Sequence, residues 1–498
     1  MLYRLLSLVF ILCFLFAVVH EARAADDNGR WTREQAWTWY KAHPWIVGFN
    51  FVPSTSCNST EIWQKESFDA KTIDHELALG ASLGFDSCRV FVQYLVWKND
   101  PNGLKQRIGQ FLEIANKHGL TTTLVLFDDC AFGDPPQSEP YLGKQHDPVP
   151  GMQNSCWTPS PGYAEIANQS DWPSLESYIK DIVGAFGHDK RVLMWDLYNE
   201  PHDNSRIPIL HATFSWARAM HPTQPLTAGV WGAPAEVSQL QLDLSDVITF
   251  HCYSNYAGVR SAIGNFKNQF RPVINTEWMA RPLGGVWSTD LPLFKCEGVG
   301  CYNWGLVNGR TQCQYAWDSP RGASEPQLWF HDLLHRNGEP YDPSEVKAIR
   351  AVTTDKIIDW DLNDYTMQLS SPTVPAHSLD GIQFSDGWTR WNGAGPFNSH
   401  LDYANAAGAE AEWTGSGSSV TLVHKVGPDC GIADIFIDGA PATQPQLDTY
   451  AAVVDYNCKS VIADHLSAGS HAITVKVSGN RNPQSSNTYF QIVSFQSF

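Results

Sequence analysis

The feature that most constrains the fold is an alternation of short apolar strands with amphipathic helical segments between about residues 45 and 340. Eight strands are predicted, at Trp45–Phe51, Ser87–Gln93, Thr121–Phe127, Leu193–Tyr198, Leu226–Trp231, Val247–Tyr253, Pro272–Glu277 and Gly298–Trp304. Between them, "LKQRIGQFLEIANKHG" and "SLESYIKDIVGAFG" repeat apolar residues at helical spacing. Eight strand–helix units predict an α/β fold of the (β/α)8 barrel type, because a doubly wound sheet rarely needs so many units in ~300 residues.

The pattern changes near residue 381. The stretches "SSVTLVHKV", "GIADIFIDG" and "HAITVKVSG" alternate apolar and polar residues, and Gly439 and Gly479 mark turns. We therefore expect a barrel domain at residues 25–355 and an all-β, jelly-roll-like sandwich at residues 381–498. Residues 356–380 form a linker or strap. Their apolar side chains favour a strap packed on the barrel: Ile357, Ile358, Trp360, Leu362 and Tyr365.

One connection within the barrel is unusually long. Residues 128–172 contain several prolines and show no clear period. Long irregular loops in compact domains are usually functional, and this one follows the third strand. We expect it to form a wall of a substrate cleft.

The N-terminus has the pattern of a secretory signal peptide over residues 1–24. Arg4 precedes an apolar run at Leu5–Val19, and Ala22-Arg23-Ala24 fits a cleavage site. A membrane anchor is the alternative, but the run is short for a span. The prediction is a secreted or periplasmic protein that is not held at a membrane after cleavage.

The net charge of −18, from 34 basic and 52 acidic residues, does not favour binding to nucleic acid or to an anionic membrane. It is compatible with a neutral substrate. We expect a monomer.

Ten of the 11 cysteines lie outside the signal segment, which contains Cys13. Export to an oxidising compartment would favour disulfides, and the two predicted pairs are Cys430–Cys458 and Cys130–Cys156. The cysteine and histidine spacings do not match a zinc site.

Two predicted strands end in a carboxylic acid. The fourth strand, in "WDLYNEP", runs into Asn199-Glu200 and is stopped by Pro201, and the seventh, in "PVINTEWMAR", reaches Glu277. Active groups of a (β/α)8 barrel lie at the C-terminal ends of its strands, so these two acids should face each other across the barrel mouth. Glycoside hydrolysis needs such a pair: one acid protonates the leaving oxygen, and the other attacks or activates water.

Other strand ends supply supporting groups. Arg89, in "SCRVF", closes the second strand, where a buried guanidinium would keep a carboxylate ionised. His251 and Tyr253 are two residues apart and so share one side of the sixth strand. Trp304 ends the eighth strand and could form the floor of a sugar site, in a chain with 20 tryptophans, 17 tyrosines and 24 phenylalanines.

Together these motifs resemble clan A glycoside hydrolases, and most closely family 5, the cellulase and mannanase family, over residues 40–340. The resemblance implies that Glu200 is the acid/base, Glu277 the nucleophile and Asn199 a donor to the sugar 2-hydroxyl. The supporting set would be Arg89, His251, Tyr253 and Trp304. The family pattern has a histidine at the end of strand three, whereas this chain has Phe127, Asp128 and Asp129 there.

The sequence thus predicts an exported, retaining β-glycoside hydrolase acting on a polysaccharide or oligosaccharide through a covalent intermediate, without metal or cofactor. Glu200 must be protonated at the start of the reaction, so its pKa should be raised, partly by the negative charge of Glu277. A transglycosylase and a non-catalytic carbohydrate-binding barrel are the alternatives, and endo or exo action stays open. The sandwich resembles carbohydrate-binding modules, with Trp388, Trp391 and Trp413 as candidate stacking residues, or is a structural brace.

Overall fold

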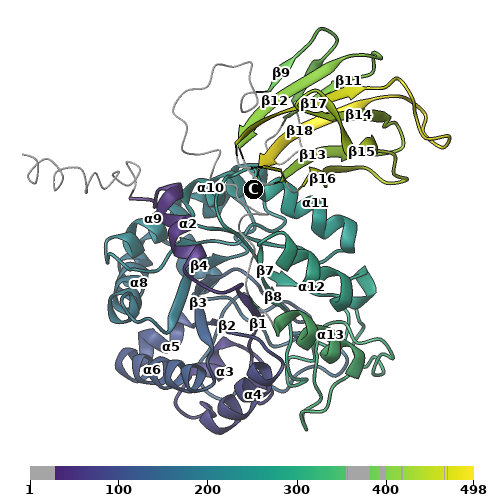
Figure 1. Ribbon diagram of the computed structural model, residues 1–498. Helices are drawn as coiled ribbons and strands as arrows, with labels where there is room; N and C mark the ends of the chain where they lie inside the picture. Colours follow the sequence, from purple (N-terminus) through teal and green to yellow (C-terminus); the bar gives the residue numbers. More distant parts are fainter. Residues whose placement is uncertain are drawn as a thin grey trace, which may run out of the picture.

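The computed structural model describes residues 29–354, 356, 382–392, 400–416, 419–464, 466–467 and 469–497. The predicted signal segment at 1–24 and residues 357–380 of the predicted strap lie outside this set. Figure 1 shows a barrel ringed by helices and a separate β-rich body packed against one end of it.

Eight parallel strands form the first body. They are β1 (Val47–Asn50), β2 (Ser87–Phe91), β3 (Thr121–Asp128), β4 (Val192–Asn199), β5 (Leu226–Thr227), β6 (Ile248–His251), β7 (Val273–Trp278) and β8 (Gly300–Asn303). Their order in the sheet is β5-β4-β3-β2-β1-β8-β7-β6, and a parallel bridge between Val230 and Phe250 joins its two edges. The predicted (β/α)8 barrel, with all eight strands, is confirmed.

Helices surround the barrel. They are α2 (Arg33–Lys41), α3 (Ser59–Trp63), α4 (Ala70–Ser82), α5 (Tyr94–Asn99), α6 (Pro101–Lys117), α7 (Tyr163–Ala167), α8 (Trp172–Phe186), α9 (Ile207–Arg218), α10 (Ala235–Leu244), α11 (Tyr256–Lys267), α12 (Trp287–Cys296) and α13 (Pro343–Thr353).

Helix α6 illustrates how the sequence sets its ends and its buried face. The Asp100 carboxylate accepts a hydrogen bond from the Gly103 amide, and Pro101 occupies the first turn, where its missing N–H costs nothing. The predicted apolar face is buried, with Ile108 and Phe111 at its centre.

Two antiparallel five-stranded sheets form the second body. The first has the order β10-β11-β18-β13-β16 and the second β15-β14-β17-β12-β9. The strands are β9 (Gln383–Phe384), β10 (Thr389–Asn392), β11 (His400–Ala404), β12 (Glu410–Ser416), β13 (Val420–Val426), β14 (Ile432–Ile437), β15 (Ala440–Asp448), β16 (Asp455–Ala463), β17 (Ser470–Val477) and β18 (Phe490–Ser497). The predicted β-sandwich is confirmed.

The sandwich packs on the end of the barrel that lies opposite the C-terminal strand ends. A single apolar cluster joins Leu401, Val423 and Val493, from the first sheet, to α2 and to residues at the N-terminal ends of barrel strands, among them Ile46 and Ile274. Arg260 of α11 also forms an ion pair with Asp455 of β16. This contact has the character of a structural interface, because it buries apolar side chains from both bodies.

The structure changes the interpretation of the sandwich tryptophans. Trp413 is buried and stacks on Phe495 within the sandwich core, at a centroid distance of 5.5 Å. Trp388 packs against the same core. Trp413 was wrong as a candidate sugar-stacking residue, because its ring is buried in the domain core, whereas Trp388 is only partly buried. Trp391 remains partly exposed and stacks on Tyr456.

Both predicted disulfides are wrong for this structure, in which every described cysteine is a free thiol. Cys430 and Cys458 are therefore unpaired. Cys130 points instead at the barrel mouth, where its thiol contacts Glu200. The Cys156 thiol contacts His146 Nδ1 at 3.2 Å and lies beside Cys57, whose pKa it raises. Sequence position alone did not identify cysteine pairs, because two cysteines can form a disulfide only when the fold brings their side chains together.

Membrane spans were sought among the described residues, and none of the helices there is both long enough and apolar enough to cross a bilayer.

Candidate active site

Glu200 and Glu277 meet at one cavity above the C-terminal ends of the barrel strands. Glu200 directly follows β4, and Glu277 is the penultimate residue of β7. The cavity measures about 310 Å³, the lower end of the range for small-molecule sites. Its lining residues are Phe91, Cys130, Phe132, Gln153, Asn154, Trp157, Asn199, Glu200, Trp231, Tyr253, Glu277, Trp304, Trp317 and His331.

Glu277 is buried and held at both oxygens. Arg89 Nη1 donates to Oε1 at 2.8 Å, and the Tyr253 hydroxyl donates to Oε2 at 2.7 Å. Burial raises the pKa of Glu277, while the charges of His251 and Arg89 and the Tyr253 hydrogen bond oppose that rise. The carboxylate is thus fixed in position, with donors that favour its ionised form.

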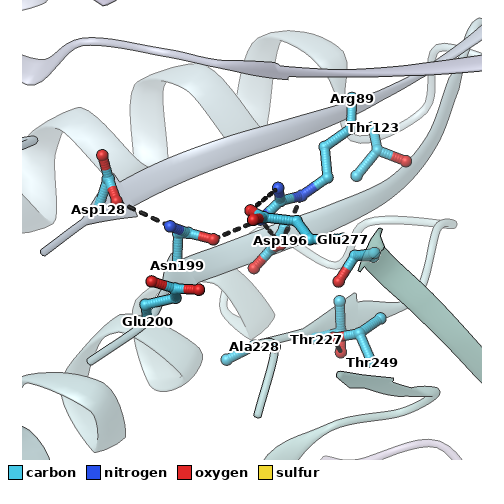
Figure 2. A network of polar contacts seen from close by, with 12 residues as sticks. Arg89, Thr123, Asp128, Asp196, Asn199, Glu200, Thr227, Ala228, Thr249 and Glu277 are labelled. Atoms are coloured by element: carbon cyan, nitrogen blue, oxygen red, sulfur yellow. Dashed lines mark hydrogen bonds and ion pairs between the residues drawn. The ribbon is translucent and has the colours of Figure 1, made fainter. Parts of the chain in front are cut away.

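Arg89 organises this side of the site. Figure 2 shows its guanidinium pointing toward Asp196, Glu277 and Asn199. Its Nε and Nη2 donate to Asp196 Oδ2 at 3.0 and 2.8 Å, and Nη2 also donates to Asn199 Oδ1 at 2.6 Å. Nη1 adds a bond to Asn50 Oδ1 at 2.7 Å. A fully buried guanidinium with two carboxylate partners stays charged, so it counters the burial of Glu277.

Glu200 has a different environment. Its backbone φ is +48°, a left-handed conformation that is uncommon outside glycine and that clusters at functional sites. The Cys130 thiol donates to Oε2 at 3.2 Å, and His251 Nδ1 lies 2.6 Å from Oε1. Burial raises the pKa of Glu200 to about 7, with a smaller contribution from the charge of Asp196. The expected rise is present, but burial is its leading cause, and the neighbouring acid is Asp196 where we expected Glu277.

His251 is buried, and burial lowers its pKa to about 4. The ring is therefore neutral near neutral pH, and its Nδ1 is in hydrogen-bond contact with Glu200 Oε1. Its Nε2 lies 3.6 Å from Glu277 Oε1. The imidazole therefore sits between the two acids.

Asp128 is the last residue of β3, within the stretch that differs from the family pattern. Its Oδ1 accepts a hydrogen bond from Asn199 Nδ2 at 2.8 Å, and its Oδ2 accepts one from Trp157 Nε1 at 2.7 Å. Burial raises the pKa of Asp128 to about 7. Because Arg89 binds the other end of the Asn199 amide, the orientation of that side chain is fixed from both sides (Figure 2).

Trp304 lies in the wall of the cavity beside the two acids. Its ring makes edge contacts with Phe91 and Trp157, at centroid distances of 5.9 and 6.0 Å, and its Nε1 donates to Cys313 Sγ at 3.3 Å. Trp157 belongs to the long loop after β3, as expected for a cleft wall. Rigid aromatic surfaces of this kind suit the flat C–H faces of sugar rings.

The two acids are close together. Ligand atoms of Glu200, His251 and Glu277 all lie within 4.8 Å of one another, so a carboxylate oxygen of each acid falls within that distance of the other. Such a triad could in principle hold a metal ion. The buried positive charge of Arg89, 2.8 Å from Glu277, disfavours a cation there, so we assign no metal to these residues.

The structure brings all seven predicted site residues to one place. Five of them line the cavity, and the other two, His251 and Arg89, contact the lining residues Glu200 and Glu277. Sequence reasoning missed Asp196, Cys130 and the loop residues Gln153 and His331. Asp196 carried a visible signal, since it is an acid inside an otherwise apolar strand. The others occupy loops without a period.

A barrel that presents this constellation of acids, guanidinium and aromatic rings has the site of a glycoside hydrolase. The family model "Cellulase (glycosyl hydrolase family 5)" matches residues 47–306, and the chain belongs to that family. None of the curated proteins matches the chain.

Similar solved structures include family 5 enzymes of low identity. A GH5_18 protein from Streptomyces cattleya in complex with GlcNAc is 14% identical, with a TM-score of 0.41, over 63% of this chain and 80% of its own. An exo-β-1,4-mannosidase from Opitutaceae bacterium strain TAV5 is 16% identical, with a TM-score of 0.43, over 66% and 62%. A β-1,4-mannanase from the sea hare Aplysia kurodai is 13% identical, with a TM-score of 0.38, over 57% and 96%. These similarities do not assign a substrate to this chain.

Proposed function

We propose that the protein is a retaining hydrolase of β-linked glycans that works through a covalent glycosyl-enzyme intermediate. The observation that carries the proposal is the separation of Glu200 and Glu277, whose nearest oxygens lie within 4.8 Å. Carboxyl groups about 5–5.5 Å apart are typical of retention, whereas inversion needs about 6.5–9.5 Å to admit a water.

The two acids have the environments that their proposed roles require. Glu277, with the Arg89 and Tyr253 donors, attacks the anomeric carbon. Glu200, whose pKa is raised to about 7, protonates the departing oxygen and then activates the water that releases the sugar. Asn199, held by Arg89 and Asp128, is placed to donate to the sugar 2-hydroxyl, in competition with its long contact to Cys130 Sγ at 3.5 Å.

The test combines product stereochemistry with two matched variants. Glu277→Gln should abolish turnover on every glycan. Glu200→Gln should lose about 10²–10⁴-fold on substrates with poor leaving groups and far less at the glycosylation step on aryl glycosides. Proton NMR of the first product should show the β anomer. An α anomer as the first product would end the proposal of retention. If the glycosyl unit is transferred mainly to a second sugar and little free sugar is released, the transglycosylase alternative is favoured.

We further propose that the protein is exported and cleaved after Ala24, on the strength of the signal pattern in residues 1–24. Expression of the full chain with and without this segment, followed by N-terminal sequencing of the extracellular fraction, tests this. Retention of the intact N-terminus in a membrane fraction would favour the anchor alternative.

A further inference from the structure

The long loop after β3 is fastened to the segment after β8. Asn154 N donates to Thr311 O at 2.7 Å, and Gly322 N donates to Pro150 O at 2.6 Å. The Gln312 side chain adds three bonds: its Oε1 accepts from the Gly151 amide, and its Nε2 donates to the carbonyls of Val149 and Met152. We call residues 149–154 together with 310–322 the bridge.

The position of the bridge follows from the strand order. In the sheet, β3 and β8 are separated by β2 and β1, so a connection between the loops of β3 and β8 passes over those two strands. The loop after β1 joins it, because Asn58 Nδ2 donates to Gln145 Oε1 and to Cys156 O. The barrel mouth is thereby closed on the side of β1 and β2.

The rim of the cavity carries exposed aromatic rings, one of them from the bridge itself. Phe132, Trp231 and Trp317 line the cavity and are 39%, 36% and 49% exposed. Large aromatic side chains left half in water at the rim of a sugar site are suited to stacking on further sugar units. The cavity thus has a closed inner end and an aromatic entrance.

Two polar side chains at the cavity have atoms without a hydrogen-bond partner in the described part of the chain. Gln153, 8% exposed, has no hydrogen-bond partner for either amide atom among the described residues, and its amide lies beside the weakly bonding Cys313 thiol. His331 is fully buried, and its Nε2 is likewise unpartnered within the described part of the chain. Leaving such groups unsatisfied is destabilising, because each has lost its hydrogen bonds to water without a replacement. A native site keeps them when a ligand supplies the missing bonds.

The protonation of His331 defines what it can bind. Its Nδ1 lies 2.5 Å from the Met279 carbonyl oxygen, so Nδ1 carries the proton and donates. Burial lowers the pKa of His331 to about 3, which keeps the ring neutral. Nε2 is therefore a bare acceptor, and its natural partner is a hydroxyl donor. The Gln153 amide offers one acceptor and two donors.

We propose that the bridge makes the cavity a blind pocket for the terminal, non-reducing sugar of a glycan, with Gln153 and His331 binding hydroxyl groups of that sugar. The inference rests on the proposed function, in which Glu277 attacks the sugar held inside. The remainder of the chain leaves past Glu200 and the aromatic entrance. The enzyme therefore removes sugar units from the chain end and does not cut within the chain.

Product sizing tests the blind pocket. The wild-type enzyme is given defined β-1,4-oligosaccharides of mannose, glucose and xylose that carry a fluorophore at the reducing end. We expect the labelled products to shorten one unit at a time, with free monosaccharide released from the start. An early ladder of internal fragments overturns the inference and leaves the glycoside hydrolase assignment standing. Absence of cleavage of these oligosaccharides, of aryl glycosides and of intact polysaccharides defeats the proposed function itself.

The hydroxyl contacts are tested first without any variant. Aryl β-glycosides of the preferred sugar that lack the 3-, 4- or 6-hydroxyl should lose about 10- to 100-fold in kcat/KM at each hydroxyl that Gln153 or His331 binds. The 2-hydroxyl is left out because Asn199 is assigned to it. Uniform tolerance of all three deoxy sugars would overturn the proposed role of both side chains.

Variants then connect each hydroxyl to its residue. Gln153→Leu preserves approximate size, and His331→Phe preserves the ring; each should lower kcat/KM on the full sugar and show no further loss on the matching deoxy sugar. Gln239→Leu, on the exposed face of α10, is the control and should behave as wild type. If a variant loses kcat/KM equally on the full sugar and on all the deoxy sugars, its residue has a structural role and does not bind a hydroxyl group.

Discussion

The thiol of Cys130 should set the alkaline limit of activity through Glu200. In the proposed mechanism Glu200 acts in its protonated form, and its pKa is raised to about 7. Activity is therefore present below that pKa and is lost as the pH rises through it. Between pH 7 and pH 9 the protonated fraction falls about 50-fold, and kcat/KM on a substrate with a poor leaving group should fall with it.

The perturbation is Cys130→Ala. The Cys130 thiol donates to Glu200 Oε2 at 3.2 Å and favours the ionised carboxylate, so it lowers the pKa of Glu200 against the effect of burial. A hydrogen bond of about 0.5–1.5 kcal/mol corresponds to roughly 0.4–1.1 pH units at 1.36 kcal/mol per unit. A thiol is a weak donor, so we expect a shift of about 0.5 unit to higher pH.

The assay is kcat/KM against pH from 5 to 9.5 on an unactivated oligosaccharide, because kcat/KM reports the groups of the free enzyme. Cys130→Ser is the matched control, since its hydroxyl keeps a donor near Oε2 and should hold the limb near the wild-type position. An alkaline limb that stays in place in Cys130→Ala, or moves to lower pH, would refute the assignment of this bond. If the alkaline limb of the wild-type kcat/KM profile lies far from pH 7, Glu200 is not the group that sets it.

Three further outcomes follow from the same structure. Arg89→Met should lower the free energy of unfolding in urea by about 3–5 kcal/mol, because it leaves the buried Asp196 carboxylate unpaired; restoring much of this in the double variant with Asp196→Asn would confirm the cause. Truncation that removes residues 382–498 should lower the melting temperature and reduce activity on short and long substrates alike, since it exposes the apolar cluster at the barrel end; loss on insoluble glycan alone would favour a binding module. Mild oxidation should link Cys57 to Cys156, whose thiols are in contact, and peptide mapping under non-reducing conditions that finds another pair would contradict this.

The features of the fold and site that depend on neighbouring residues could be predicted from the sequence. Strand and helix periods are properties of neighbouring residues, so all eight barrel strands were predicted, and the β-sandwich with them. The two acids were found for the same reason: each ends an apolar run, and the barrel topology places all such ends at one mouth. The supporting residues Arg89, His251 and Tyr253 followed from strand positions.

What could not be predicted depends on segments that are far apart in the chain. Asp128 was noted as a departure from the family pattern, but its bond to Asn199 needed the pairing of β3 with β4. The buried stacking of Trp413, and the contact of Cys156 with Cys57, likewise depend on contacts between segments distant in sequence.

The sequence by itself determined the architecture and the two candidate catalytic acids, because periodicity and strand ends are encoded within a few residues of one another. Only the tertiary structure decided the shape of the cavity, the neighbours that set the pKa of Glu200, and the unpartnered side chains of Gln153 and His331. Those features arise where two loops without regular structure, more than 150 residues apart, pair through individual hydrogen bonds such as that of Asn154 with Thr311. No local sequence pattern predicts which loops form hydrogen bonds with each other.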